Sequence, residues 1–230
     1  MASILSSKEI REQRLKQVIS EDQLISRRTY NLILGGVTLY GLVINAVLCA
    51  YASDFALSIN PIALIIGYFI LCMAGTFIAR GSKSAIISFL GYNLIVVPLG
   101  LVLSIVVSQY GGINMPVVQQ AFVLTAGITA IMTAASVTFP NFFSKIGGVL
   151  FIALAGLLIV GFIQMFLRSD GILFSVAGAG IFSLYIGYDM YRSQQFSPTA
   201  DNAVDCAIDL YLDIINLFIH LLRILGRSDD

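Results

Sequence analysis

The chain has 230 residues, of which 58% are apolar and 11% are charged, whereas about 25% of the residues in an ordinary soluble domain are charged. Thirteen Lys and Arg residues balance 13 Asp and Glu residues, which excludes the basic surface that nucleic-acid binding needs. Three widely spaced cysteines (Cys49, Cys72, Cys206) and one histidine (His220) exclude a disulfide framework and a zinc site. We therefore expect one domain embedded in a lipid bilayer.

Seven stretches of the chain are long enough to cross the hydrocarbon core of a bilayer, which takes about 20 helical residues. The first five contain no ionisable Asp, Glu, Lys, Arg or His, the sixth is rich in glycine, and the seventh contains Asp209, Asp213 and His220. Backbone groups in a bilayer must be hydrogen-bonded within the protein, so the sequence predicts an all-α integral membrane protein with seven transmembrane helices. The predicted spans are Asn31–Ala52, Pro61–Ala79, Ser84–Ser108, Pro116–Thr138, Ile146–Leu167, Gly171–Tyr188 and Cys206–Leu222.

The Lys and Arg residues between the spans predict the orientation. With the N-terminus in the cytoplasm, ten of them lie on the cytoplasmic side and three on the other side. The C-terminus is outside if all seven segments cross, and inside if the seventh is re-entrant. The ten are Lys8, Arg11, Arg14, Lys16, Arg27, Arg28, Arg80, Lys83, Lys145 and Arg192, and the three are Arg168, Arg223 and Arg227.

Three regions follow from this pattern: a cytoplasmic N-terminal segment (1–30), a seven-helix transmembrane domain (31–226) and a C-terminal tail (227–230). The N-terminal segment lacks the apolar stretch of a cleaved signal peptide. Ser6 and Glu9 have the spacing of a capping box ahead of several apolar residues, which favours a short amphipathic helix on the membrane face. A solvated tail is the alternative.

Polar and charged residues form one stripe along the last predicted helix. At about 100° per residue, six of them fall within roughly 80° of arc around the helix axis. A charge at the bilayer centre costs at least about 2.5–3.5 kcal/mol, so this polar stripe must face the bundle interior or a wet cavity. We therefore expect six helices to surround a central C-terminal helix. The polar stripe consists of Asp205, Asp209, Asp213, Asn216, His220 and Arg223.

Asp189 ends the sixth predicted span, and Asp213 lies in the cytoplasmic half of the seventh. Arg80, at the end of the second span on the same side, is the predicted cationic partner of one of these carboxylates. If Asp189 and Asp213 come within hydrogen-bonding distance, ionising both carboxyl groups costs free energy because the two negative charges repel each other. The two residues then share a proton as a coupled pair. The sequence therefore predicts a pH sensor, with Arg80 as a candidate latch of a closed state.

Plainer roles are expected for other ionisable residues. Asp201 and Asp205 are expected near the start of the last helix, where negative charge favours the helix dipole. Arg223 and Arg227 are expected to anchor its far end at the membrane interface. His220 is either a satisfied interior histidine or part of a proton path. The candidates for lining a pore or attracting cations are Asp205, Asp209, Asn216 and His220.

Two aspartates on adjacent membrane helices are compatible with two mechanisms. An intramembrane aspartyl protease needs two carboxylates that share a proton, and such enzymes carry Tyr-Asp on one helix and Gly-x-Gly-Asp on the next. Here the second motif is Leu210-Tyr211-Leu212-Asp213, without either glycine, so we expect no enzyme activity.

The second mechanism is conduction of cations. Carboxylate oxygens are suitable ligands for Ca²⁺. Asp189 and Asp213 would then form a weak calcium site, because tight binding would block the path.

The segment 207–226, AIDLYLDIINLFIHLLRILG, closely resembles the signature of the Bax inhibitor-1 family. The seven predicted spans and Tyr188-Asp189 at the end of the sixth agree with that family. The resemblance implies six helices around a central seventh and a pH-sensitive calcium leak governed by a di-aspartyl pair. On this sequence the pair is Asp189 and Asp213, and the arginine near the end of the second span is Arg80. No cofactor is implied, and calcium ions and protons are the expected partners.

The sequence departs from the family pattern in two places. Met190-Tyr191 follows the sixth-span aspartate, where the family usually has Thr-Gln, and Asp209 adds a carboxylate one turn before the seventh-span aspartate. The chain ends in residues 227–230, RSDD, rather than in a basic tail, which favours a bacterial plasma membrane over the endoplasmic reticulum. A bundle that regulates other membrane proteins and conducts little is the alternative function.

Overall fold

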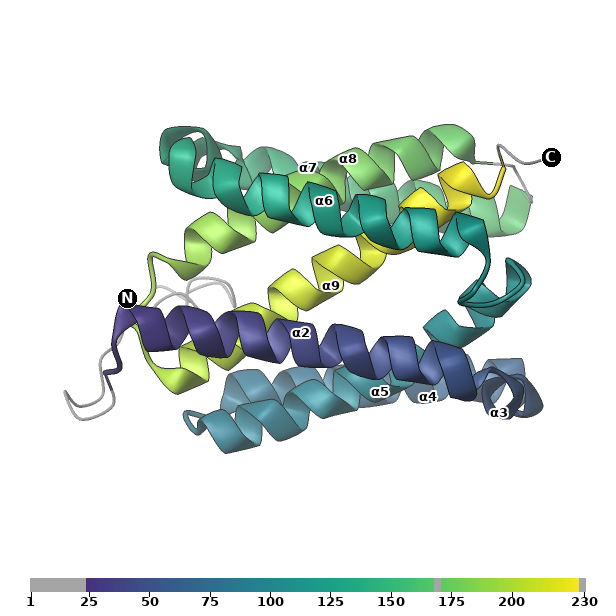
Figure 1. Ribbon diagram of the computed structural model, residues 1–230, viewed down its shortest axis with the longest axis horizontal. Coiled ribbons are helices and arrows are strands. Elements are labelled where there is room, and N and C mark those ends of the chain that lie inside the picture. The colour runs from purple at the N-terminus through teal and green to yellow at the C-terminus, as the bar shows by residue number, and fades with distance from the viewer. Residues whose placement is uncertain (1–23, 168–170, 228–230) are drawn as a thin grey trace, which may run out of the picture.

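The computed structural model describes residues 24–167 and 171–227, and these residues form helices without a strand. The all-α prediction is confirmed for this part of the chain. The N-terminal helix expected around Ser6 and Glu9 lies outside the described residues. All the helices except the short α3 run along the long axis of the molecule (Figure 1). They are α2 (Arg27–Tyr51), α3 (Ser53–Ser58), α4 (Pro61–Gly81), α5 (Ala85–Gln109), α6 (Pro116–Thr138), α7 (Pro140–Leu167), α8 (Ile172–Ser193) and α9 (Ala200–Leu225).

Three helices begin earlier than their predicted spans: α9 begins at Ala200 rather than Cys206, and α2 and α7 begin early for local reasons. Helix α2 begins at Arg27 rather than Asn31, because the Ser26 side chain caps it by accepting a hydrogen bond from the first turn. Helix α7 begins at Pro140 rather than Ile146, and proline is favoured at the first helical position because no hydrogen bond from its nitrogen is needed there. The predicted spans stopped at charged residues, whereas a helical backbone continues through them.

Six of the described helices, α2 and α4 to α8, are long and apolar enough to cross a membrane. Many of their large apolar side chains are exposed, as expected for surfaces that face lipid. The seventh predicted span lies within α9, whose apolar stretch also contains Asp209, Asp213 and Arg223. With these three charged residues, the apolar stretch of α9 differs from those of the six candidate spans, each of which has at most two. The chain is therefore all-helical with six candidate membrane spans.

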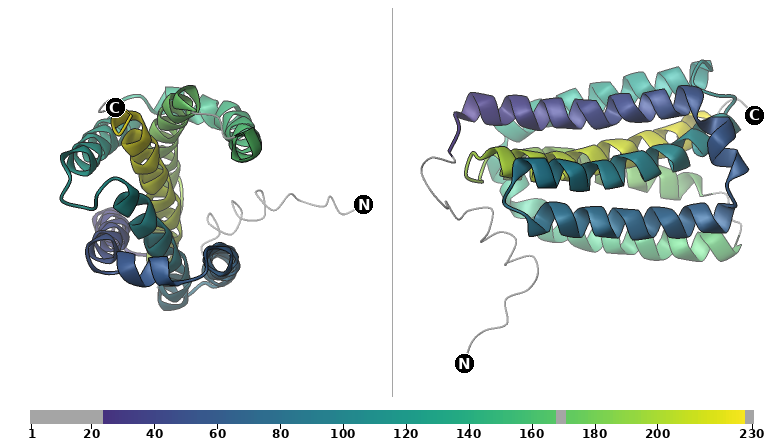
Figure 2. Two further views of the ribbon diagram at one scale, coloured as in Figure 1. Left: turned by 90° about the vertical axis from the view of Figure 1, so that its right-hand side faces the viewer. Right: turned by 90° about the horizontal axis from the view of Figure 1, so that it is seen from below.

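Most residues of α9 are buried, whereas α4 and α7 are mostly exposed. Helix α9 packs against α2 and α5 and also against α6 and α8, and it crosses between these two pairs (Figures 1 and 2). Helix α4 packs on α5, and α7 packs on α8. The chain thus forms two groups of helices, α2–α5 and α6–α8, which meet chiefly through α9.

Buried polar side chains join α9 to the α2–α5 group. The hydroxyl of Tyr211 donates a 2.7 Å hydrogen bond to Asn45, whose amide donates a 3.0 Å bond to the carbonyl of Val96. The rings of Tyr92 and Tyr211 meet edge to face at 5.3 Å, and the Tyr92 hydroxyl donates to the carbonyl of Val37. Interhelical hydrogen bonds of this kind help to hold membrane helices together.

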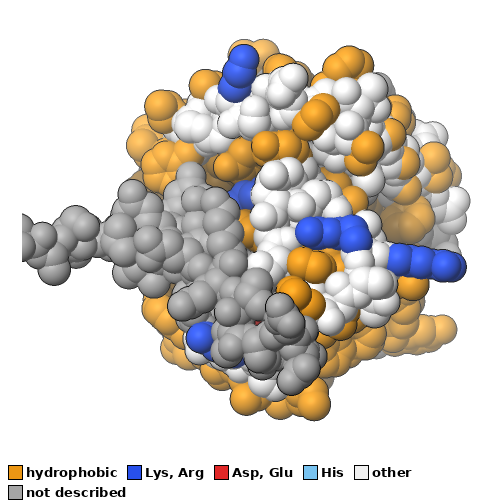
Figure 3. Space-filling model, turned by 90° about the vertical axis from the view of Figure 1, so that its left-hand side faces the viewer, with side chains coloured by type: hydrophobic (Ala, Val, Ile, Leu, Met, Phe, Trp, Pro, Cys, Tyr) orange, Lys and Arg blue, Asp and Glu red, His pale blue; other side chains and the backbone are white. Residues whose placement is uncertain are grey.

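Lys and Arg residues gather at one end of the bundle, where α2 begins and α4 and α8 end (Figures 1 and 3). Six of the eight described Lys and Arg residues belong to segments at this end. The other two, Arg223 and Arg227, lie at the opposite end of α9. The six are Arg27, Arg28, Arg80, Lys83, Lys145 and Arg192.

Candidate functional site

Asp189 and Asp213 come from two helices that pack side by side. Asp189 lies one turn before the end of α8, and Asp213 lies near the middle of α9. Their carboxyl groups are hydrogen-bonded to each other, and Asp213 is only 8% exposed. The structure therefore brings together the two aspartates that the sequence singled out.

A hydrogen bond between two carboxyl groups requires a proton on one of them, because an ionised carboxylate only accepts. Two ionised carboxylates in contact would repel each other in an interior of low dielectric constant. The second oxygen of Asp213, Oδ2, is buried and has no hydrogen-bond partner among the described residues. A buried acceptor without a partner costs free energy, so this oxygen is available to accept a proton or to contact a cation.

Two arginines flank the aspartate pair. Nη2 of Arg80, in the last turn of α4, lies 3.0 Å from Oδ1 of Asp209, one turn before Asp213 on α9. Nη1 of Arg192 lies 3.9 Å from Oδ1 of Asp189 on the same helix. The sequence predicted that Arg80 would partner Asp189 or Asp213, and the structure shows an ion pair between Arg80 and the neighbouring Asp209. The carboxyl pair is thus bordered by two cations, one from α4 and one from α8.

Sequence reasoning missed two neighbours of the pair. Arg192 was counted only as a charge that sets the orientation, and Tyr185 was not considered. Tyr185 lies one turn before Asp189 on α8, close enough to interact electrostatically with both Asp189 and Asp213. Residues three or four apart on a helix are neighbours. Tyr185 lies four residues before Asp189 and Arg192 lies three residues after it, so this spacing was the signal that could have identified both.

The start of α9 is held by its own polar residues. Thr199 is the N-cap, and its side chain accepts a hydrogen bond from the backbone of the first turn. Asp201 lies in the first turn, as expected, and its Oδ1 accepts a 2.6 Å hydrogen bond from the hydroxyl of Ser88 on α5. Asp205 lies one turn later and is 5% exposed. These contacts fix the beginning of α9 beside the α2–α5 group.

The remaining polar residues of the stripe lie further along α9 than the aspartate pair. The amide of Asn216 donates a 2.8 Å hydrogen bond to the carbonyl of Leu212 on its own helix. His220 is buried between the rings of Phe174 and Phe182 of α8, whose centroids lie 5.3 and 5.6 Å from its own. His220 therefore belongs to an aromatic contact between α8 and α9, two turns away from the aspartates.

The part of the chain that the structure describes contains no group of three or more His, Cys, Asp or Glu side chains that could hold a metal ion. Calcium takes six to eight oxygen ligands, and two carboxyl groups supply at most four oxygens. The Asp189–Asp213 pair would therefore contact a cation together with backbone or water oxygens.

The chain matches the family described as "Inhibitor of apoptosis-promoting Bax1" over residues 21–230. This chain belongs to the Bax inhibitor-1 family. The matched region contains all the described helices and every residue of the aspartate site. The resemblance carried by the C-terminal segment is therefore confirmed.

Among curated proteins, this member of the Bax inhibitor-1 family is similar to proteins of bacteria and of a virus. It is 30% identical to an uncharacterised protein of Borreliella burgdorferi, over 84% of this chain and 89% of that protein. It is 26% identical to the inner membrane protein YbhL of Escherichia coli, over 87% of this chain and 92% of that protein. It is also 38% identical to the Golgi anti-apoptotic protein of vaccinia virus, over 56% of this chain and 54% of the viral protein. The chain thus matches about half the length of that viral relative.

Family membership and the six candidate spans agree with each other. A helix of 21 residues or more that is apolar on its outer surface is long enough for the hydrocarbon core. This member of the Bax inhibitor-1 family is therefore a multi-pass membrane protein.

Proposed function

We propose that this protein is a pH-sensitive calcium leak in which the Asp189–Asp213 pair controls a cation path. The observation that carries the proposal is the contact between these two carboxyl groups, one of them buried, inside a bundle of membrane helices. Ionisable residues at such depth typically mark an ion pathway or a proton relay. Their position on two adjacent helices couples their protonation to the packing of α8 against α9.

The proton on the pair acts as the switch in this proposal. With the proton present, the hydrogen bond holds α8 to α9. Without it, two carboxylates repel each other, and their oxygens become ligands for a passing divalent cation. The pH therefore shifts the equilibrium between two arrangements of the helices, because only one of them favours the protonated pair.

The proposal includes α9 as a seventh transmembrane helix, with the other six around it. Its burial and its contacts with α2, α5, α6 and α8 support this arrangement. The polar stripe would then be shielded from lipid, which is what its charges require. A cation path along α9 would run between the two groups of helices.

The ion pair between Arg80 and Asp209 would act as a latch of the closed state. It ties the end of α4 to α9 one turn before Asp213. Breaking it would free a third carboxylate, that of Asp209, beside the pair and release α9 from α4. Asp209 is thereby the partner through which Arg80 acts on the switch.

We place the protein in a bacterial plasma membrane with its N-terminus in the cytoplasm. The end of the bundle where α2 begins carries most of the described Lys and Arg residues (Figure 3), and cytoplasmic segments are enriched in these residues. The similarity to an Escherichia coli inner membrane protein supports the same location.

Calcium flux into proteoliposomes tests the proposal directly. Purified wild-type protein is compared with Asp213→Asn and with Asp54→Asn, an exposed acidic residue of α3, from about pH 5 to 8. We expect wild-type flux that varies with pH, loss of that variation in Asp213→Asn, and wild-type behaviour in Asp54→Asn. No flux above that of empty vesicles at any pH would overturn the leak.

One comparison favours a second function, regulation of other membrane proteins without conduction. The vaccinia virus relative is named as a Golgi anti-apoptotic protein, and that name describes an effect on the cell rather than a transported ion. A chain that carries no calcium but co-purifies with a defined membrane partner would support this function. We propose no enzyme activity for this protein. If the wild-type protein cleaved a membrane peptide and Asp213→Asn did not, that result would contradict the absence of enzyme activity.

A further inference from the structure

A pocket of about 290 Å³ opens at the end of the bundle opposite the beginning of α2. It lies where α5 and α9 end and α8 begins, so segments far apart in the sequence contribute to it. Its size is close to the lower end of the range of small-molecule pockets, about 300–1,000 Å³. The pocket is lined by Tyr110, Gln164, Gly171, Ile172, Phe174, Ser175, Arg223 and Arg227.

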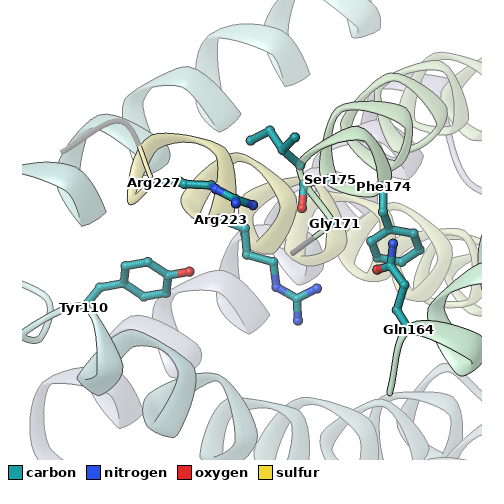
Figure 4. A pocket seen from close by; sticks show the side chains of 8 residues that line it. Tyr110, Gln164, Gly171, Phe174, Ser175, Arg223 and Arg227 are labelled. Carbon is teal, nitrogen blue, oxygen red and sulfur yellow. The ribbon is translucent and has the colours of Figure 1, made fainter. Parts of the chain in front are cut away.

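The described residues that line this pocket carry positive charge. Arg223 and Arg227 line it, and none of the described lining residues is acidic. Figure 4 shows the guanidinium group of Arg223 extending from α9 into the space between Tyr110 and Gln164. Arg223 is exposed and forms no ion pair with a carboxylate of the described residues. Its donors therefore face the pocket without a counter-charge from the part of the chain that the structure describes.

Other donors point to the same space. Gly171 is the N-cap of α8 and has no side chain, so the first turn of this helix receives no side-chain cap. Uncapped N–H groups at a helix N-terminus, together with the helix dipole, favour an anion. The hydroxyl of Tyr110 and the amide of Gln164 add neutral donors from two further helices. A guanidinium fork beside such donors matches the oxygens of a phosphate group.

We propose that this pocket binds a phosphate group, with Arg223 as its principal ligand. The phosphate belongs either to the headgroup of a membrane lipid, which the end of a membrane bundle would meet, or to a soluble phosphate compound. The site lies at the C-terminal end of α9, whereas Asp213 lies near the middle of that helix. The proposal does not depend on calcium conduction. Arg223 thereby has a specific ligand rather than the general anchoring role expected from its position near the end of a membrane helix.

Binding measurements on the full chain test this site with two probes. Inorganic phosphate is titrated into protein in detergent by calorimetry, with chloride at equal ionic strength as the reference. Phosphatidic acid is presented in phosphatidylcholine nanodiscs, and retained lipid is counted by native mass spectrometry. Binding of the first probe alone indicates a soluble phosphate, and binding of the second alone indicates a lipid headgroup.

The variant Arg223→Gln should weaken binding of the effective probe roughly tenfold, because one charge-assisted contact is lost. Arg28→Gln, an exposed arginine at the opposite end of the bundle, should leave the affinity unchanged. Arg223→Lys keeps the positive charge but lacks the planar guanidinium group that can donate two parallel hydrogen bonds, so it should give an intermediate affinity. If Arg223→Gln does not fold, Arg223→Lys is measured in its place. The proposal is overturned if neither probe binds, if no Arg223 variant changes the affinity, or if Arg28→Gln weakens binding equally.

Discussion

The hydroxyl of Tyr211 on α9 donates a 2.7 Å hydrogen bond to Oδ1 of Asn45 on α2. Both side chains are buried, and the amide of Asn45 donates in turn to the carbonyl of Val96 on α5. One asparagine therefore links three helices. Without the Tyr211 hydroxyl, Oδ1 of Asn45 would lose this donor in a buried position, and such a loss costs free energy.

The variant Tyr211→Phe should lower the free energy of unfolding by about 1 kcal/mol, since hydrogen bonds between membrane helices contribute about 0.6 kcal/mol on average and up to about 1.7. Chemical unfolding in detergent measures the change. Tyr51→Phe is the matched control, because Tyr51 is 86% exposed. Equal stability of the two variants would mean that the Tyr211 bond contributes nothing.

Replacing Asp213 by Asn should flatten the dependence of stability on pH. The hydrogen-bonded pair holds a proton in the folded protein, whereas aspartates of the unfolded chain have released theirs above about pH 5. Unfolding then releases a proton, so the wild-type free energy of unfolding falls as the pH rises, by at most about 1.4 kcal/mol per pH unit. In Asp213→Asn the amide can donate to Asp189 without that proton, and the fall disappears.

Unfolding measurements at several pH values between about 5 and 8 check this expectation. The control is Asp54→Asn, which changes an exposed carboxyl group of α3 and should keep the wild-type slope. A slope in Asp213→Asn as steep as that of the wild type would show that the proton is held elsewhere.

Breaking the Arg80–Asp209 ion pair should raise calcium flux at a fixed pH with little loss of stability. The Arg80 side chain is 36% exposed, so the pair contributes less than about 1 kcal/mol to folding. Arg80→Gln and Asp209→Asn should have similar effects on flux, and the double variant should add little, because both remove the same contact. Lys83→Gln changes a nearby exposed cation and serves as the control. Flux that stays at the wild-type level in Arg80→Gln would argue against the latch.

Adding a methyl group at Gly178 should disturb the contact between α8 and α9. A Cβ atom at this position would overlap the ring of His220, and overpacking typically costs about 1–3 kcal/mol. At Gly180, two residues along α8, a Cβ atom would have no neighbour within 4 Å. Gly180→Ala should therefore be neutral or stabilising by up to about 1 kcal/mol, since alanine favours helix. Thermal unfolding of both variants tests the difference, and equal midpoints would contradict it.

The sequence predicted the main features of the fold because its strongest signals are long apolar runs. Six of the seven predicted spans coincide with helices that are long and apolar enough to cross a membrane. Their ends were less accurate: the charge-free runs missed the cap at Ser26 and the helix start at Pro140. Capping residues and proline positions decide where a backbone becomes helical, whereas charge decides only where lipid contact ends.

The aspartate pair of the candidate site was predictable from the sequence, whereas the ion pair between Arg80 and Asp209 was not. Four residues of helix advance the side chain by about 400°, so Asp209 and Asp213 point in directions about 40° apart. That difference lets Asp209 meet Arg80 of α4 while Asp213 meets Asp189 of α8. Periodicity alone shows that both residues share a face, and only the packing of the neighbouring helices decides which partner each one receives.

The position of α9 between two groups of helices has a consequence for biosynthesis. It follows α2–α5 and α6–α8 in the chain, and those two groups meet chiefly through it. A growing chain therefore inserts both groups into the membrane before the element that joins them has been made. Assembly is completed only when α9, with its aspartates, enters the space between the two groups, and until then Oδ1 of the buried Asn45 on α2 lacks the hydrogen bond that Tyr211 donates to it.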